Sequence, residues 1–187
     1  MTTAMPRPAA PPRALDAPPR ALDAPVPALD APVPALRTAR PDEATALAAL
    51  SRPFVRSGAL RERPVSLYAA HAADFLVLEA PDGTLDGCVG LRAYPANARE
   101  DGELAGVVYN FCVAANRQGS GAGAGLLRAV LVTARARSLG ALFTATTGSA
   151  GLFLRHGFTP TTAHRAPRTW AQSLDPRRDA RVLIRTW

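Results

Sequence analysis

The chain has 187 residues and a mass of 19.6 kDa, and 48% of its residues are hydrophobic, which is enough apolar material for the core of one domain. All 22 basic residues are arginines, and against 15 acids they give a net charge of +7. No segment is apolar over the ~20 residues of a membrane span, and prolines interrupt the N-terminus where a signal peptide needs an apolar core. We therefore expect a cytoplasmic protein with no membrane partner.

The N-terminal segment is a proline-rich repeat. Residues 1–41 hold eleven of the eighteen prolines, and from Ala10 a seven-residue unit occurs four times, as APPRALD, APPRALD, APVPALD and APVPALR. Two prolines per unit prevent a continuous helix, and one leucine per unit buries too little surface to offset the entropy of ordering. We expect residues 1–35 to be a disordered, partly polyproline II tail and 36–187 to be the domain. A docking arm for an aromatic groove is the alternative.

From Leu36 onward the patterns are those of a folded domain. Pro41 and the two acids after it are typical of a helix start, because proline suits the first turn and acids favour the positive end of the helix dipole. The turn residues at 81–83 predict a hairpin. The expected elements are a strand at 36–39, a helix continuing over 44–50, a helix over 66–73, and hairpin strands at 75–78 and 88–92.

Strands and helices alternate in the second half. The expected elements are a strand at 107–113, an amphipathic helix over 124–139 stopped by Gly140, a strand at 141–147, a short helix at 149–155, a strand after Phe158 and a last strand at 181–185. Trp170 and Trp187 are expected to pack on the C-terminal strands. This order predicts an α/β domain with a mixed sheet and helices on its faces.

A glycine-rich loop, QGSGAGAGLL at 118–127, lies between an expected strand and an expected helix. Glycines let a ligand approach the backbone, and amides at a helix N-terminus favour an anion. A Walker A loop would need Lys and then Ser or Thr where Leu126 and Leu127 stand, which excludes it. A dinucleotide fold would need an acid about twenty residues later, and 104–174 contain none, which disfavours it. A Gly-rich turn without a ligand is the alternative.

The acid-free stretch 104–174 carries a side-chain charge of +7 from seven arginines. A polyanionic ligand is therefore expected at this part of the domain. A nucleic-acid module would interleave aromatic residues with the basic ones, and here the arginines are scattered around the glycine loop. We therefore expect no nucleic-acid partner.

Three motifs in order resemble the GNAT superfamily of N-acetyltransferases. Gln118, Gly121 and Gly123 match its acetyl-CoA loop, which reads Arg or Gln, two residues, Gly, one residue, then Gly or Ala. Val113 precedes this loop as in the family's strand, and LFLRHGF at 152–158 resembles the family's aromatic-x-x-x-Gly-Phe ending. The resemblance covers roughly 36–187. It implies the GNAT fold, in which a mixed, mostly antiparallel sheet has helices on both faces.

This resemblance implies acetyl-CoA as the cosubstrate. Its pantetheine arm is expected to pair with the backbone of one strand, and its pyrophosphate to bind amides of the glycine loop. The cofactor-binding residues that the resemblance implies are Phe111, Cys112, Val113, Gln118, Gly119, Ser120, Gly121, Ala122, Gly123, Ala124 and Thr146.

Within the superfamily the sequence is most similar to the acetyltransferase domain of the N-acetylglutamate synthase family. The likeness is carried by GALR at 58–61, GEL at 102–104, RR at 177–178 and RVL at 181–183, among other short matches. It implies an amino-acid acceptor such as L-glutamate, a place in arginine biosynthesis, and a short form with no room for the kinase-like domain of longer relatives. Because a guanidinium offers two parallel hydrogen bonds, carboxylates are expected to bind Arg61, Arg63 and Arg181.

Acetyl transfer needs a neutral amine, a donor for the oxyanion and a proton for the thiolate. Glu103 is the expected base, directly or through water, and Tyr109 is the second candidate. Many relatives place a tyrosine acid where this chain has Phe153, which has no proton to donate. Ser149 or Thr147 is therefore the expected donor, although each could instead cap a helix.

Other functions stay open at this point. The acceptor could be another small amine, an aminoglycoside-like compound or a protein N-terminus, and the phenylalanine at 153 keeps a non-catalytic acyl-CoA-binding regulator in consideration. Cys88, Cys112 and the three histidines lack metal-ligand spacing, so we expect no metal. The expected partner is a small-molecule amine, and a homodimer is left open.

Overall fold

A computed structural model describes residues 34–95 and 104–187. The expected disordered tail over 1–35 thus lies almost wholly outside the described residues and stays a prediction. The last residues of the fourth repeat unit are described, and they belong to the first strand, β1 (Ala35–Thr38).

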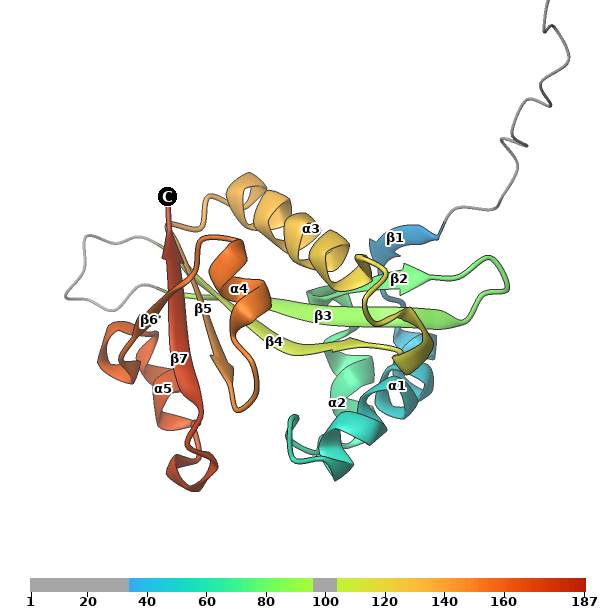
Figure 1. The fold of residues 1–187 in the computed structure, drawn as a ribbon, viewed down its shortest axis with the longest axis horizontal. Helices are drawn as coiled ribbons and strands as arrows, with labels where there is room; N and C mark the ends of the chain where they lie inside the picture. The colour runs from blue at the N-terminus through green and yellow to red at the C-terminus, as the bar shows by residue number, and fades with distance from the viewer. Residues whose placement is uncertain (1–33, 96–103) are drawn as a thin grey trace, which may run out of the picture. The chain divides into compact units, whose positions relative to one another are not determined.

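One sheet holds the seven strands of the described residues, in the order β1-β2-β3-β4-β5-β7-β6 (Figure 1). Neighbouring strands are antiparallel except β4 and β5, which are parallel. This confirms the expected mixed, mostly antiparallel sheet. Beyond β1, the strands are β2 (Phe75–Glu79), β3 (Leu85–Tyr94), β4 (Ala105–Val113), β5 (Ala141–Thr146), β6 (Thr159–Thr161) and β7 (Arg181–Thr186).

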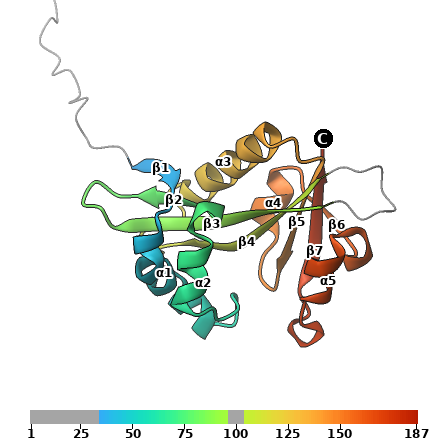
Figure 2. The ribbon, with the colours of Figure 1, turned by 180° about the vertical axis from the view of Figure 1, so that it is seen from behind.

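Helices cover both faces of the sheet, as expected (Figures 1 and 2). One face carries α3 (Ala122–Ala136) and α4 (Gly151–Arg155), and the other carries α1 (Ala44–Arg56), α2 (Val65–Ala70) and α5 (Arg168–Gln172). Short 3₁₀ turns connect these elements: η1 (Pro41–Glu43), η2 (Ala72–Asp74), η3 (Ala115–Arg117), η4 (Ala163–Arg165) and η5 (Pro176–Arg178).

Side-chain alternation along the strands divides the core between the two faces. Leu142 of β5 and Leu183 of β7 pack with α3, whereas Phe143 and Ile184 beside them pack with Trp170 of α5. A further cluster joins α1 and α2 to β2 and β3. The face below the sheet is therefore covered in two separate halves, one by α1 and α2 and one by α5 (Figure 1).

The end of α3 corrects one expectation. The helix was expected to run to 139 and stop at Gly140, but it ends at Ala136, and Ser138 takes the left-handed conformation with φ 53°. The amide of Leu139 then donates to the carbonyl of Ala134 at 3.0 Å, which closes the helix as glycine usually does. Burial of Leu139 offsets the strain of a non-glycine residue there.

A further expectation was incomplete: the first helix continues past residue 50 to Arg56, with Pro53 inside it. Trp170 lies in α5 and packs on the C-terminal strands as expected, against Phe143 of β5, with ring centroids 6.4 Å apart, and in one cluster with Val182 and Ile184 of β7.

Candidate active site

The central strands β4 and β5 separate after a short parallel pairing. Their register runs only from Ala105 and Ala141 to Val107 and Phe143. Beyond that point β4 and β5 are no longer paired with each other, although β4 stays paired with β3 and β5 stays paired with β7. The two strands therefore diverge (Figure 1). The edge of β4 that faces the gap is no longer paired with β5 over 108–113, which leaves backbone groups for a ligand.

A bulge in β4 lies beside this separation. Tyr109 is paired with Gly90 and Cys112 with Cys88, so β4 has one residue more than β3 between these pairs. The residue at the bulge, Asn110, has a φ of 48°, a conformation that asparagine tolerates better than most residues.

The side chain of Asn110 is 3% exposed and joins three neighbouring segments. Its Nδ2 donates to Ser51 Oγ at 2.9 Å, and its Oδ1 accepts from Arg63 Nη1 at 3.1 Å and from the Tyr68 hydroxyl at 3.2 Å. The bulge is therefore fixed to α1, to α2 and to the loop between them. The sequence pattern did not identify Asn110, because a bulge has no signal in strand periodicity.

The glycine loop leads from the end of β4 into α3. Gln118 Nε2 donates to the carbonyl of Val113 at 3.2 Å, which folds the loop back on the strand. Gly119 and Gly121 have φ values of 78° and 88°, a region that glycine enters without strain. A Cβ added at either glycine would have no atom within 4 Å, so the loop faces open space.

The first backbone bond of α3 runs from the amide of Gly125 to the carbonyl of Gly121 at 2.9 Å. The amides of Ala122, Gly123 and Ala124 precede it and have no acceptor within the helix. The amide of Ser120 instead donates to the carbonyl of Arg117 at 3.3 Å. The expected cradle is thus centred on the amides that open α3, which can bind an anion.

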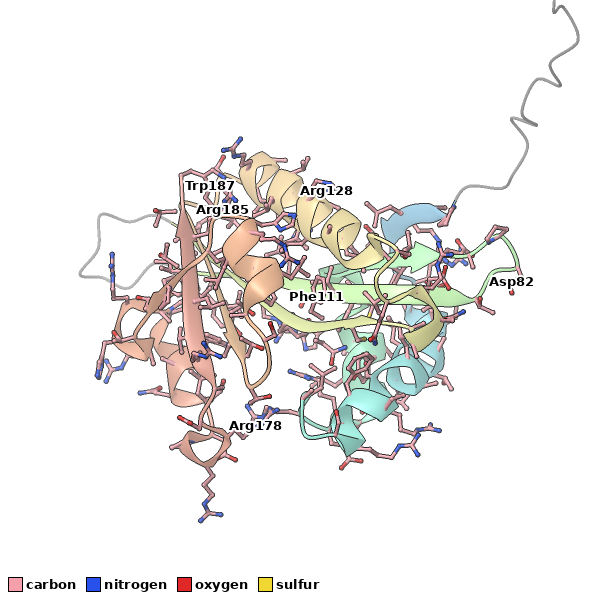
Figure 3. All side chains as sticks on the ribbon, in the orientation of Figure 1. Asp82, Phe111, Arg128, Arg178, Arg185 and Trp187 are labelled. Carbon is pink, nitrogen blue, oxygen red and sulfur yellow. The ribbon has the colours of Figure 1, made fainter. Side chains whose placement is uncertain are left out.

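Phe111 connects the loop with the separated strands. Phe111 lies on β4 below the start of α3 (Figure 3), and a Cβ at Gly123 would lie 3.6 Å from its ring, an ordinary van der Waals distance. The ring also contacts Phe153 edge-on, with centroids 5.8 Å apart. Phe153 itself is buried against Phe158, which makes it a packing residue.

A cavity of about 950 Å³ opens on the other side of the separation, between the two covered halves of the sheet face. Its lining includes Tyr109 and Asn110 of β4, Ala145 of β5 and the following Thr147. The cavity therefore reaches the gap between β4 and β5, on the face that carries α1, α2 and α5.

Arginines dominate the charge of this cavity. The lining contains Arg61, Arg63, Arg92, Arg178 and Arg181 against two exposed aspartates, Asp175 and Asp179. The three arginines expected to bind carboxylates thus come together in one cavity, although they are far apart in the sequence.

The state of these guanidinium groups differs from one to the next. Arg63 is half-buried, and burial lowers its pKa below the usual range. Its Nη1 donates to neutral oxygens, the side chain of Asn110 and the carbonyl of Arg61. Arg181, at the start of β7, is exposed. Arg63 is therefore a partly desolvated cation whose hydrogen-bond acceptors are uncharged.

Arg61 and Arg178 instead link the two sides of the cavity. Arg61 Nη1 donates to the carbonyl of Ser173 at 2.7 Å, and Arg178 Nη2 donates to the carbonyls of Gly58 and Ala59 at 2.6 and 3.0 Å (Figure 3). The segment after α1 and the segment after α5 are thus joined by side-chain bonds. The expected carboxylate role of Arg61 competes with this bond.

Tyr109 lines the same cavity and contacts charged groups. Its hydroxyl donates to Asp74 Oδ2 at 3.0 Å, and Arg92 Nη2 lies 2.8 Å from the same oxygen. Burial and the Asp74 charge raise the pKa of Tyr109, so its hydroxyl stays protonated at neutral pH. Asp74 and Arg92 were not expected at the site, since neither belongs to a motif.

The other candidate groups lie elsewhere. Glu103 falls outside the described residues. Ser149 is exposed, and its hydroxyl accepts from the amide of Gly151, the first residue of α4, at 3.3 Å, while the N-cap position itself is held by Ala150. Thr146 Oγ1 accepts from the amide of Gly148 at 3.2 Å. The catalytic roles of Glu103 and Ser149 stay predictions.

The described residues contain no group of three or more His, Cys, Asp or Glu side chains that could hold a metal ion. Cys88 and Cys112 are free and buried, with sulfur atoms 3.3 Å apart. In the described ranges, 34–95 and 104–187, no helix has both the length and the apolar character needed to cross a membrane.

Comparison with known proteins agrees with this geometry. Residues 71–160 match the model of the acetyltransferase (GNAT) domain. The chain is 33% identical to amino-acid acetyltransferases of Ralstonia nicotianae over 149 residues and of Azotobacter vinelandii over 150 residues. These alignments cover 80% and 79% of this chain and 32% of each relative, so the chain spans about a third of their length.

A solved structure is similar over the same part of the chain. It is N-acetylglutamate synthase from Neisseria gonorrhoeae in complex with coenzyme A and N-acetyl-glutamate, with 27% identity and a TM-score of 0.73. The match covers 83% of this chain and 35% of that one. The separated strands, the glycine loop and these matches together show that the chain belongs to the GNAT family of N-acetyltransferases.

Proposed function

We propose that this domain transfers the acetyl group of acetyl-CoA to the α-amine of an amino acid, such as L-glutamate, as a cytoplasmic enzyme of arginine synthesis. The observation that carries the proposal is the cavity of arginines that opens on the gap between β4 and β5. The names of the similar proteins, amino-acid acetyltransferase and N-acetylglutamate synthase, support it.

The residues at the gap fit acetyl-CoA. The open edge of β4 at Phe111, Cys112 and Val113 offers backbone groups to a pantetheine arm, and the amides that open α3 offer donors to a pyrophosphate. When bound, acetyl-CoA supplies the activated thioester. Backbone amides of β4 would then donate to the carbonyl oxygen of the thioester during transfer.

The cavity fits an anionic acceptor. A dicarboxylic amino acid brings two negative charges, and each must find cationic donors or stay desolvated and unpaired, which is costly. Arg63 is a partly desolvated cation with neutral acceptors, so a carboxylate would add a charged partner to its hydrogen bonding. Arg181 lines the same cavity and is a candidate for the second carboxylate.

The test is turnover of acetyl-CoA across a panel of amino acids that includes L-glutamate, L-glutamine and L-leucine. Turnover is measured as the release of the free thiol of coenzyme A. We expect L-glutamate to have the highest kcat/KM. The matched amide L-glutamine controls for size, because it lacks only the side-chain charge. Preference for an uncharged amine would overturn the amino-acid assignment in favour of another acceptor, and acetyl-CoA binding without turnover would indicate a regulator.

A further inference from the structure

Three side chains from separate elements meet at one edge of the acceptor cavity. Asp74 closes η2, Arg92 lies on β3 and Tyr109 lies on β4. The Tyr109 hydroxyl donates to Asp74 Oδ2 at 3.0 Å, and Arg92 Nε donates to the same oxygen at 2.9 Å. Tyr109 and Arg92 line the cavity, so a ligand there reaches Asp74 through them.

The Tyr109 ring occupies space that any side chain at Gly90 would fill. A Cβ at Gly90, its partner across the strands, would lie 2.5 Å from Cζ of the ring. Guanidinium groups of Arg63 and Arg92 lie 5.4 and 5.3 Å from the ring centroid. The phenol is therefore fixed between two cations, with its hydroxyl directed to a carboxylate.

The chemistry of the proposed function requires a path for a proton. An α-amine is an ammonium at neutral pH and must lose a proton before it can attack a thioester. The cations around the ring favour the neutral amine by repulsion. The carboxylates that line the cavity among the described residues, Asp175 and Asp179, are exposed, and Asp175 already accepts from the amide of Arg177.

We propose that Tyr109 and Asp74 form a proton exit from the acceptor cavity. An ammonium N–H bond breaks and leaves its electron pair on nitrogen, while Tyr109 Oη gains that proton and passes its own to Asp74 Oδ2. The amine, the phenol and the carboxyl are then all neutral. Asp74 returns to the carboxylate by releasing the proton toward solvent. This inference rests on the proposed function and gives it a second proton acceptor besides Glu103.

The exit toward solvent runs past His71. Its Nδ1 lies 4.0 Å from Asp74 Oδ2, and its side chain is 39% exposed. The raised pKa of Tyr109 fits a group that relays a proton and does not itself hold a negative charge. Arg92 restores a favourable charge pair once Asp74 is ionised again.

The remaining charged groups of the elements that pack on η2 are engaged elsewhere. On η1, Asp42 lies 3.9 Å from Arg40, and Glu43 pairs with Arg37 at 2.5 Å. Arg37 of β1 also pairs with Glu79. Among the described residues, the ionisable groups that face Asp74 are therefore Arg92, Tyr109 and His71.

The test compares Asp74→Asn and Tyr109→Phe with the wild type at saturating acetyl-CoA. L-glutamate is the acceptor, replaced by the fastest amino acid of the panel where that is another one. Asp82→Asn is the matched control, because that carboxylate is exposed and accepts only from Thr84 in a turn. We expect kcat at pH 7 to fall about 100-fold in both relay variants, with the KM for acetyl-CoA unchanged.

The pH profile separates a relay from a structural role. As pH rises toward the pKa of the amine, the neutral fraction grows, so the loss in both variants should shrink. An aminooxy analogue of the acceptor, which is uncharged at neutral pH, should be acetylated at the wild-type rate by both variants. Asp82→Asn should match the wild type throughout.

Several results would overturn the proton exit. A loss that is equal at all pH values and equal for the aminooxy analogue would show that the cluster only supports the fold. Wild-type kcat in Tyr109→Phe, with loss confined to Glu103→Gln, would assign the proton to Glu103. Asp74→Asn also removes the ion pair with Arg92 and can destabilise the fold. Tyr109→Phe keeps that ion pair, so its pH profile and its rate with the aminooxy analogue test the relay without Asp74→Asn. A wild type that acetylates none of the panel would overturn the proposed function itself, and the relay with it.

Discussion

The glycine loop and the arginine cavity lie at opposite ends of the gap between β4 and β5, and they are built differently. The loop is one continuous segment whose backbone amides do the work, with glycines at φ 78° and 88°. The cavity is assembled from side chains of the segment after α1, of β3, of β4 and of the C-terminal segment. A backbone site tolerates little change in main-chain conformation, whereas a side-chain site can be altered one contact at a time.

The largest expected effect comes from breaking the loop. Gly121→Val places a β-branched residue at φ 88°, which costs about 1–3 kcal/mol of strain and shifts the amides that open α3. We expect the Kd for acetyl-CoA, measured by calorimetry, to rise at least about 100-fold in a folded protein.

Gly125→Ala is the matched control for the loop. Gly125 lies within α3, where a Cβ has no atom within 4 Å, and alanine favours a helix over glycine by about 1 kcal/mol. The Kd should therefore stay unchanged while the melting temperature rises slightly. Unchanged affinity in folded Gly121→Val would contradict the assignment of this loop.

The second prediction alters only the acceptor end. Arg63→Ala should raise the KM for L-glutamate about 10- to 100-fold, the scale of about 1.5–3 kcal/mol for a hydrogen bond to a charged group. The Kd for acetyl-CoA should barely change, because the loop is on the other side of the gap. Arg181→Ala is expected to act in the same way.

Arg52→Ala provides the comparison for the arginine variants. Arg52 is an exposed residue of α1 and does not line the cavity, so its removal changes the net charge by the same amount. Steady-state kinetics should show wild-type KM values for it. An equal rise in KM for Arg52→Ala would indicate a general charge effect in place of a specific carboxylate site.

The third prediction concerns the bulge that connects the two ends. Asn110→Gly keeps the freedom to adopt φ 48° but removes one hydrogen-bond partner from each of Ser51, Tyr68 and Arg63, which should cost about 2 kcal/mol in the free energy of unfolding. Asn110→Ala should cost about 1 kcal/mol more, because alanine is strained there.

Urea titration of these two variants measures the effect. The KM for L-glutamate should rise in both, since Arg63 loses the amide oxygen that orients it, and acetyl-CoA affinity should change less. Equal stability of the two variants would mean that the left-handed backbone at Asn110 is not needed for the fold.

The smallest expected effect is on stability, and it comes from an ion-pair cluster outside both the glycine loop and the arginine cavity. Arg37 bridges Glu43 and Glu79, and its hydrogen bond lowers the pKa of Glu43 from 4.5 to about 2. A depressed carboxyl pKa stabilises the fold above the unfolded value and loses that contribution as pH falls from about 4.5 to about 2.

Glu43→Gln should therefore lower the free energy of unfolding by about 1 kcal/mol at pH 7, and the difference from the wild type should vanish near the lower pH. Urea titration at several pH values checks this, and both ligand affinities should be unchanged. A difference that persists under acid would assign the effect to packing.

Much of the fold could be predicted from local patterns. Each of the main strands coincides with an apolar run, and the helix after the glycine loop coincides with a segment of 3.6-residue periodicity. The existence and the order of these elements were therefore predicted correctly. The errors occur where tertiary contacts decide. Ser138 replaces glycine as the helix stop because Leu139 is buried beside it, and the bulge at Asn110, which strand periodicity does not signal, is held by Ser51, Arg63 and Tyr68.

The sequence by itself determined the glycine loop, the proposed cofactor site, because a backbone site needs only a continuous segment with glycines at fixed spacing. Only the tertiary structure decided the arginine cavity, the proposed acceptor site. Arg61 and Ser173 are 112 positions apart, and Asp74 and Tyr109 are 35 apart, so no local pattern records their contact. The sheet order brings them together, because the parallel pairing of β4 and β5 ends at Val107 and opens the face between α2 and α5.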